Sequence, residues 1–199
     1  SFDAPEISEL FGTWGNPDLT PETGSNFDIG MEQVFTDQLR GGITFFRIGM
    51  DDHIEYLRST NQYANVDWES TGLESYLEWD VNQQLMLRVG HTWADAERKG
   101  VDDTLLFHSP EHTLSLMVDF SMLDDRLQHA ITIQYVDERE TWDGPVDAFT
   151  VVDWSTRFQV NEQASVWLRV ENLLDETYEE ILYYRAPGLG VFGGFKLEF

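Results

Sequence analysis

The sequence predicts an all-β protein, a transmembrane antiparallel β-barrel, and three observations support this fold class. About nine segments alternate between apolar and polar residues with a period of two, which is the period of a β-strand. The connections between these segments alternate between short and long. The last segment, Leu189–Phe199, alternates to its end and finishes on an aromatic residue. A barrel strand that spans a membrane has this pattern, because one face meets lipid and the other meets a wet lumen.

The elements follow one another along a single domain. Residues 1–24 are rich in Gly, Pro, Asn, Asp and Thr and have no periodicity, so we expect an extracellular loop there and strands over residues 25–199. The expected strands are, in order, Asn26–Phe35, Gly42–Met50, Val66–Trp79, Leu85–Ala94, Thr113–Ser121, Leu127–Asp137, Phe149–Val160, Ala164–Asn172 and Leu189–Phe199.

The connections favour a barrel of the outer-membrane type. The short polar ones are Thr36–Arg40, Asp80–Gln84, Met122–Arg126 and Asn161–Gln163. The long ones are Asp51–Asn65, Asp95–His112, Glu138–Ala148 and Leu173–Gly188. Short turns on the periplasmic side and long loops outside are typical of such barrels. With the C-terminus on the periplasmic side, all the short turns are expected there as well.

Composition excludes several classes of protein. The 37 acidic residues outnumber the 12 basic ones and give a formal net charge of −25, so a nucleic-acid-binding groove is excluded and no nucleic acid is expected as a partner. The absence of cysteine excludes a disulfide scaffold. The chain has no G-x-S-x-G, Walker A or G-x-G-x-x-G motif and no cysteine nucleophile, so we expect no enzyme.

Candidate metal ligands occur but lack a suitable pattern. His108 and His112 flank Glu111, but Pro110 interrupts the helix that would align the two imidazoles. The pairs Asp51–Asp52 and Asp102–Asp103 lack the spaced ligands of a calcium loop. We therefore expect no metal site, and no cofactor.

Alternation assigns side chains to the two faces of the expected barrel wall. The lumen-facing candidates are the charged residues on the polar faces, namely Arg88, Asp119, Asp153, Arg157, Arg169, Glu171 and Lys196. The candidates for aromatic girdles at the lipid–water boundary are Trp68, Trp79, Trp93, Tyr135 and Trp154.

Several motifs carry a resemblance to a known family. Near the start stand Phe2-x-Ala4-Pro5, Glu9-Leu10-Phe11 and Gly15-Asn16-Pro17-x-Leu19-x-Pro21-Glu22, followed by Tyr63-x-Asn65. Near the end stand Glu171-Asn172-Leu173-Leu174-Asp175-Glu176-x-Tyr178 and the terminal Gly194-x-x-Leu197-x-Phe199. In this order they resemble the C-terminal barrel portion of TonB-dependent outer-membrane receptors. The terminal Gly194, Leu197 and Phe199 resemble the assembly signal of bacterial outer-membrane proteins.

The resemblance implies a 22-stranded barrel that is filled by an N-terminal plug, in the outer membrane of a Gram-negative bacterium. Such a receptor imports a scarce nutrient, for example a ferric siderophore, haem, cobalamin or an oligosaccharide. This chain would be a fragment with roughly the last nine strands, without the plug and with an export signal upstream. The implied partners are outer-membrane lipid, the upstream strands and plug of the same protein, TonB through the missing N-terminal part, the small nutrient and the barrel assembly machinery.

Two other interpretations remain open from the residues alone. A small stand-alone outer-membrane barrel of eight or ten strands, with a structural or binding role, would pair its first and last strands directly. A soluble all-β binding module or carbohydrate enzyme would cover both faces of its sheet, and the apolar stripes would then form a sandwich core.

Overall fold

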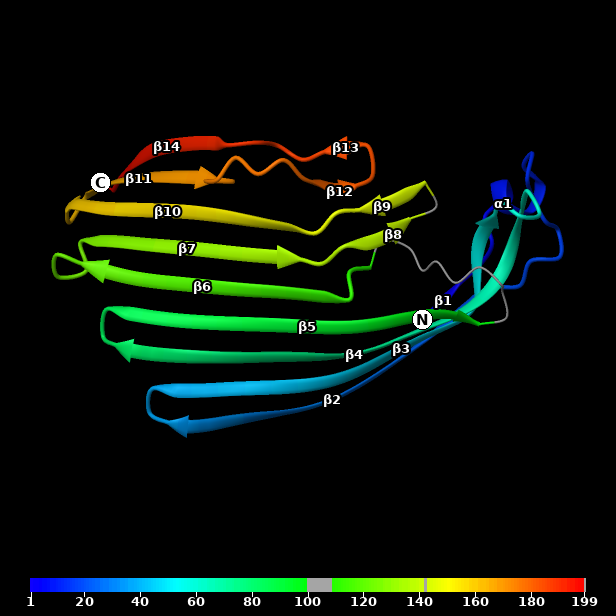
Figure 1. Cartoon of the computed structure of the whole chain (residues 1–199), viewed down its shortest axis with the longest axis horizontal. Helices are drawn as coiled ribbons and strands as arrows, with labels where there is room; N and C mark the ends of the chain where they lie inside the picture. The colour runs from blue at the N-terminus through cyan, green and yellow to red at the C-terminus, as the bar shows by residue number, and fades with distance from the viewer. Residues whose placement is uncertain (100–108, 142, 199) are drawn as a thin grey trace.

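A computed structural model describes residues 1–99, 109–141 and 143–198 of the chain. Ten strands form one antiparallel sheet in the order β1-β2-β3-β4-β5-β6-β7-β10-β11-β14 (Figure 1). Their bounds are β1 Phe2–Asp3, β2 Glu22–Thr36, β3 Leu39–Leu57, β4 Gln62–Asn82, β5 Leu85–Lys99, β6 His112–Met122, β7 Leu127–Val136, β10 Phe149–Asn161, β11 Ala164–Glu171 and β14 Gly190–Leu197. Two further hairpins, β8 (Arg139–Thr141) with β9 (Gly144–Val146) and β12 (Glu179–Ile181) with β13 (Tyr184–Arg185), stand apart from this sheet.

The nine predicted strands correspond to the nine long strands of the sheet, so the predicted fold class is confirmed. The prediction was wrong for 51–65, because β3 and β4 continue through this region and only residues 58–61 form the turn. The long connection there is a tall hairpin, and the alternation was hidden by the register shift between Met50 and His53.

Residues 1–24 also differ from the plain loop that we predicted. Phe2 and Asp3 pair with Thr23 and Glu22, and β2 begins at Glu22. Between them lies one short helix, α1 (Ile7–Phe11), whose first turn is closed by Glu9 accepting the Glu6 amide at 2.8 Å. No helix of the described residues is long and apolar enough to cross a membrane.

Three short turns share one device. The side-chain oxygens of Thr36, Asn82 and Asn161 each accept the backbone N–H two residues on, at 3.2, 2.8 and 2.9 Å. Such local bonds favour a tight reversal over a continued strand. All the short turns lie at the same end of the sheet as the C-terminus, which Figure 1 shows on the left, and the long connections lie at the other end.

The register places a continuous apolar row on one face of the sheet from β5 to β14. Directly paired residues share a face, and the row Leu87–Val118–Ile131–Trp154–Val170–Val191 runs through six strands. The neighbouring row Met86–Asp119–Ala130–Ser155–Arg169 lies on the opposite face. We call these the apolar face and the polar face.

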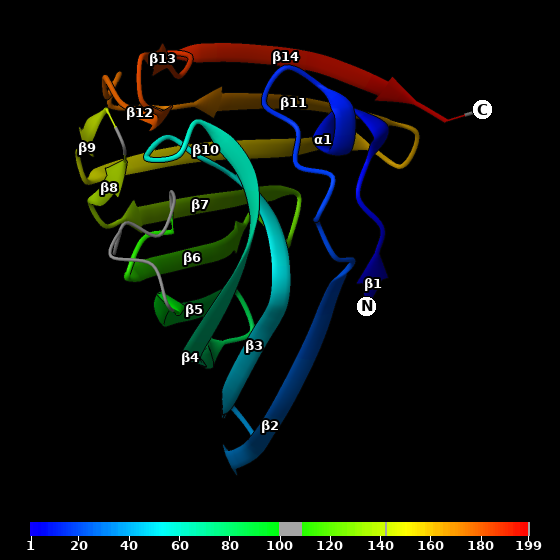
Figure 2. The same cartoon turned by 90° about the vertical axis from the view of Figure 1, so that its right-hand side faces the viewer.

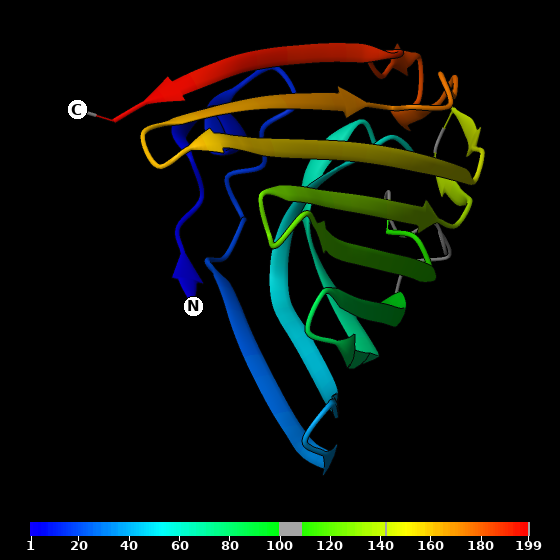
Figure 3. The ribbon, with the colours of Figure 1, turned by 90° about the vertical axis from the view of Figure 1, so that its left-hand side faces the viewer.

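The sheet is a single curved layer, as Figures 2 and 3 show, and not a sandwich. Its end strands do not pair with each other in the described part of the chain, so the sheet is open. This arrangement does not match the closed pairing that a small stand-alone barrel requires. The buried apolar side chains, Leu19, Leu57, Val66, Val136, Val146, Phe149 and Val170, gather toward the long-loop end.

Candidate functional site: the polar face and its mouth

The polar face is the hollowed side of the sheet. A hollow of about 750 Å³ lies near the short turns, with Asp119, Arg157, Trp167 and Arg169 among its lining residues. A second hollow of about 580 Å³ lies at the long-loop end, which we call the mouth. The polar face is therefore concave, and these two hollows are among the places on it where a small molecule or another part of the protein fits.

All seven lumen-facing candidates share this polar face by register, namely Arg88, Asp119, Asp153, Arg157, Arg169, Glu171 and Lys196. Arg169 pairs with Glu171 at 2.9 Å, and Lys196 pairs with Glu198. The Asp153 carboxylate accepts the Asn172 amide at 2.8 Å. That these residues face the lumen of a closed barrel stays a prediction.

An ion-pair cluster crosses three neighbouring strands of the polar face. Glu78 on β4 pairs with Arg40 on β3 and, at 3.4 Å, with Arg88 on β5. The Arg88 guanidinium also lies 4.8 Å from the centre of the Tyr76 ring. The two arginines and Glu78 are directly paired in the register, so cross-strand neighbours neutralise one another along the wall.

The N-terminal motif docks onto the tall β3–β4 hairpin. Asn16 Nδ2 donates to the Tyr63 carbonyl at 3.1 Å, and the Tyr63 amide donates to the Trp14 carbonyl at 3.0 Å. Asn65 Oδ1 accepts the Thr20 amide at 2.9 Å, and Asn65 Nδ2 donates to the carbonyls of Thr20 and Asp52. Two motifs that are about 45 residues apart in sequence are therefore one structural unit.

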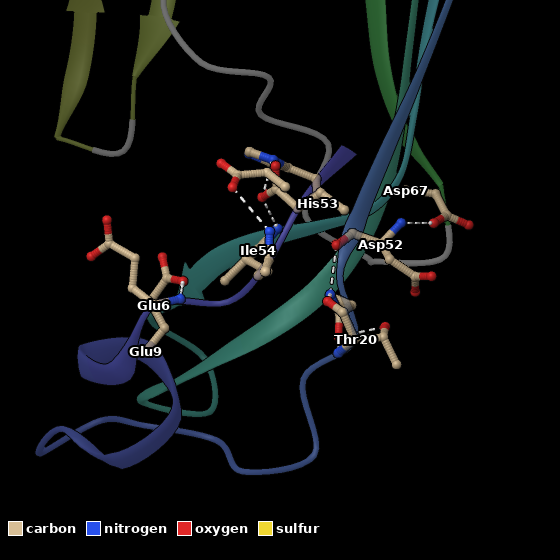
Figure 4. A network of polar contacts seen from close by, with 11 residues as sticks. Glu6, Glu9, Thr20, Asp52, His53, Ile54 and Asp67 are labelled. Atoms are coloured by element: carbon tan, nitrogen blue, oxygen red, sulfur yellow. Dashed lines mark hydrogen bonds and ion pairs between the residues drawn. The ribbon is translucent and has the colours of Figure 1, made fainter. Parts of the chain in front are cut away.

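The rest of this motif completes the same unit. Leu19 is buried, and Pro17 and Pro21 frame it in a segment without regular structure. Glu22 Oε1 accepts the Ile54 amide at 2.6 Å and lies 3.0 Å from His53 Nδ1 (Figure 4). The Asp52 amide donates to Asp67 at 2.9 Å in the same network. The left-handed backbone of Asp52, with φ of 61°, fits the bulge at this point.

The C-terminal motif folds the last long connection back toward β14. Asn172 is buried, and its side chain donates to the carbonyls of Glu176 and Pro187 and accepts the Glu176 amide. Asp175 accepts the Leu189 amide at 2.9 Å. The Leu173 amide donates to the Val152 carbonyl at 2.7 Å, which extends the ladder by one step.

Tyr178 lines the mouth hollow and packs on Phe149, with ring centres 4.4 Å apart. Burial raises its pKa, and the carboxylates of Glu180, Asp153 and Glu171 raise it further. The mouth hollow therefore combines an aromatic wall with the carboxylates of Asp153, Glu171 and Glu180 and the guanidinium of Arg139.

The residues of the terminal motif are placed only in part. Gly194 is paired with Trp167 on the polar face, and a β-carbon at position 194 would lie 2.9 Å from the indole. Leu197 is on the apolar face, paired with Ala164. Phe199 lies outside the described residues, as do Asp102, Asp103 and His108 of the metal candidates.

Among the described residues, no group of three or more His, Cys, Asp or Glu side chains is arranged to hold a metal ion. The girdle prediction needs one correction. Trp79, Trp93, Tyr135 and Trp154 lie on the apolar face, but Trp68 lies on the polar face, where its ring meets His53 edge-on at 6.5 Å. Trp68 pairs with Met50 and Arg98, one step out of phase with the apolar row of β4.

Sequence reasoning missed three ion pairs at the mouth. They are Arg98 with Glu55, His53 with Glu22, and Arg58 with Asp143. The last pair joins residues that are 85 positions apart, so no local sequence pattern predicts it. The first pair lies on the tall β3–β4 hairpin, which had been taken for a loop, and the register does not place Arg98 directly opposite Glu55.

An antiparallel wall with an apolar face, a polar concave face and all long connections at one end defines a transmembrane β-barrel wall. Residues 1–173 match the family described as TonB dependent receptor-like, beta-barrel. The chain belongs to this family, which confirms the predicted resemblance. It is part of a β-barrel of the Gram-negative outer membrane, in a family of non-enzymatic transporters.

A curated relative agrees with this assignment. The vitamin B12 transporter BtuB of Vibrio vulnificus is 26% identical over 189 residues, which are 89% of this chain and 29% of that protein. The chain thus spans less than a third of the length of this relative.

Solved structures show the same fold. The copper transporter OprC superposes with a TM-score of 0.80 at 18% identity, over 100% of this chain and 36% of that one. The ferric-catecholate import receptor Fiu of E. coli K12 gives 0.75 at 18% identity, over 99% and 30%. The pyoverdine receptor FpvA of Pseudomonas aeruginosa gives 0.75 at 16% identity, over 91% and 30%.

Proposed function

We propose that the full-length protein imports a scarce nutrient across the outer membrane in a TonB-dependent manner, and that this chain supplies part of the barrel wall and its extracellular connections. The observation that carries the proposal is the antiparallel wall of nine long strands, with an apolar row that crosses six of them on one face and hollows on the other. The remaining strands, the plug and the TonB contact would come from upstream parts of the protein. The residues 1–24 would lie on the extracellular side.

The relatives support an import function but differ in what their names say they carry: vitamin B12, copper, ferric catecholate and pyoverdine. The candidate cargo is the set that the family resemblance implies, a ferric siderophore, haem, cobalamin or an oligosaccharide. The mouth hollow offers the Tyr178 and Phe149 rings together with Gln134 and Thr113 as contacts for such a molecule.

Uptake assays on the full-length protein test this proposal. The protein is expressed in a Gram-negative host that lacks its own receptors, and uptake of each candidate nutrient is measured with and without TonB. We expect uptake of one class that disappears without TonB. Uptake of none of the classes, or uptake that does not need TonB, would contradict the proposal.

Tyrosine variants test whether the mouth hollow of this chain contributes to uptake. Tyr178→Ala should lower uptake because Tyr178 lines the mouth hollow, whereas Tyr184→Ala should not, because Tyr184 is 73% exposed at a hairpin tip. Tyr178→Phe keeps the ring contact with Phe149 and serves as the folding control. Equal uptake in the Tyr178→Ala and Tyr184→Ala proteins would remove the mouth hollow from the pathway.

Assembly has a separate test, since Gly194, Leu197 and Phe199 are proposed to be read by the barrel assembly machinery. Deleting Phe199 from the full-length protein should reduce the amount in the outer membrane without reducing synthesis. Normal surface levels of the deletion protein would show that the terminal aromatic residue is not a signal here.

A further inference from the structure

An ion pair links two hairpins at the mouth. Arg58 lies in the turn between β3 and β4, and Asp143 lies in the turn between β8 and β9. Arg58 Nη1 lies 3.0 Å from Asp143 Oδ1, and Nη2 lies 3.3 Å from Oδ2. The contact is bidentate, which fixes the relative orientation of the two side chains.

The two hairpins belong to distant parts of the wall. In the sheet, β5 and β6 separate β4 from β7, which leads into the β8–β9 hairpin. Three strand spacings put β4 and β7 about 14 Å apart. The tips meet despite this separation, so the hairpins lean toward each other across the mouth.

A third hairpin joins the same point. Tyr183, in the turn between β12 and β13, donates its hydroxyl to the Asp143 carbonyl at 3.4 Å. At the base of the hairpins, Arg139 Nη2 donates to the Glu180 carbonyl at 2.6 Å. The β8–β9 hairpin is thus held from both sides, and Asp143 is the residue that the other two hairpin tips share.

The turn that carries Asp143 is prepared for this role. Thr141 is buried, donates its hydroxyl to the Gly144 carbonyl at 2.7 Å, and accepts the Asp143 amide at 3.3 Å. Gly144 adopts a φ of 132°, which favours glycine. The side chains of Arg58 and Asp143 are 56% and 52% exposed, so their ion pair is weak enough to open and close readily.

Hollows of the polar face lie at the bases of the linked hairpins. Arg139 and Glu180 line the mouth hollow, and Glu55 of the tall hairpin lines a neighbouring hollow of about 490 Å³. We propose that Arg58 and Asp143 form a reversible latch that holds the mouth closed and must open before a ligand reaches the polar face. The entry of a ligand by this route rests on the proposed function, whereas the closure of the mouth does not.

Labelling of a reporter cysteine tests the closure without any transport assay. These 199 residues contain no cysteine, so a Thr113→Cys reporter in the mouth hollow is distinct, provided that the full-length background has no other accessible thiol. The rate of reaction with a bulky, membrane-impermeant maleimide is measured on the full-length protein in outer membranes. A Ser8→Cys reporter on the exposed α1 is the control.

The latch predicts a specific pattern of rates. Arg58→Ala and Asp143→Ala should each speed labelling at position 113 by about two- to five-fold, as expected for the loss of an exposed ion pair. The exchanged pair Arg58→Asp with Asp143→Arg should restore the slow rate. The rate at position 8 should not change. Unchanged rates in both single variants, or no restoration by the exchanged pair, would overturn the latch.

A locked protein tests whether the latch must open. Arg58→Cys and Asp143→Cys are joined by a cleavable bis-maleimide in the full-length protein, and TonB-dependent uptake is measured before and after cleavage. We expect uptake to be lost in the locked protein and to return on cleavage. Normal uptake while locked would overturn the opening requirement. Absence of uptake in the unmodified protein would instead overturn the proposed function, and the labelling rates would still decide the closure.

Discussion

The strand wall and the mouth are stabilised in different ways, although the same strands run through both. In the wall, apolar side chains remain exposed: Ile29 is 61% exposed, Met31 65% and Phe195 75%. At the mouth, Leu57, Val66, Val136, Val146 and Phe149 are buried against the long connections. The wall leaves its apolar face for lipid to cover, whereas the mouth stands in water and must bury its own apolar groups.

The hydrogen bonds follow the same division. The wall depends on the backbone ladder, which pairs the peptide groups of neighbouring strands and suits a medium without water. At the mouth, side-chain hydrogen bonds to the backbone replace the ladder. Asn16 and Asn65 hold the N-terminal segment, and Asn172 holds the last connection. The comparison indicates that substitutions on the apolar face of the wall should act through lipid, and substitutions at the mouth through local packing.

The largest effect is expected from a charge on the apolar face of the wall. Val118 pairs with Leu87 and Ile131 on this face, whereas its neighbour Asp119 is on the polar face and lines the large hollow. Val118→Arg should cost about 2–4 kcal/mol near the midplane of the bilayer. Unfolding of the full barrel in lipid measures this cost. Asp119→Arg is the matched control and should be much milder, and equal penalties would mean that the faces are assigned backwards.

A smaller and more local effect is expected at the mouth. Asn172→Ala removes three hydrogen bonds of a buried side chain and should cost about 1–3 kcal/mol. Hydrogen exchange on the full-length protein should show loss of protection in residues 172–189 while the wall strands stay protected. Asn65→Ala should instead release residues 14–22. If either variant loosened both segments equally, the mouth would be one cooperative unit and not two.

Substitutions of two adjacent glycines on β14 distinguish a loss of packing from a loss of recognition by the assembly machinery. Gly194→Ala puts a β-carbon against the Trp167 indole and should cost about 1 kcal/mol, because the half-exposed indole has room to shift. Gly193→Ala should be neutral, since its β-carbon comes no closer than 3.4 Å to a neighbour. Unfolding in lipid gives both costs. If Gly194→Ala lowered the assembled amount without any loss of stability, Gly194 would act as part of the assembly signal.

The smallest effect concerns pH at the mouth. The hydrogen bond and charge of Arg58 lower the pKa of Asp143 in the folded protein. The pair therefore contributes fully above the ordinary Asp pKa of about 3.9, and the contribution is lost as pH falls through the lowered value. Because maleimides react with the thiolate, the rate at Thr113→Cys is divided by the rate at the Ser8→Cys control, which cancels the shared fall in thiolate at low pH. This ratio should be insensitive to pH above this range and should rise below it. In the Asp143→Ala protein the rise should be absent.

The sequence predicted where the long strands lie and which face each side chain occupies. It could do so because a long strand with lipid on one face and water on the other keeps a period of two. The tall β3–β4 hairpin was not readable, because the bulge at Asp51–Asp52 shifts the alternation and the hairpin beyond it stands clear of lipid. The facing of Trp68 was misjudged for a related reason, since aromatic residues suit both a lipid boundary and a packed mouth.

The motifs illustrate the same limit at the level of single residues. Asn16, Asn65 and Asn172 were recognisable by resemblance, but their hydrogen bonds became visible only with the backbone in place. The cluster of Arg40, Glu78 and Arg88 required the register, which short turns set and composition does not.

The sequence by itself determined the wall: nine long strands, their two faces and the common end of the short turns, because these features arise from contacts between near neighbours and from the solvent on each side. Only the tertiary structure decided how the mouth is built. Three contacts at the mouth join residues that are far apart in the chain. Arg58 pairs with Asp143, residues 14–22 dock on the tall hairpin, and Tyr178 packs on Phe149. Such contacts depend on the curvature of the sheet and on the reach of each hairpin, and no local pattern of residues encodes either.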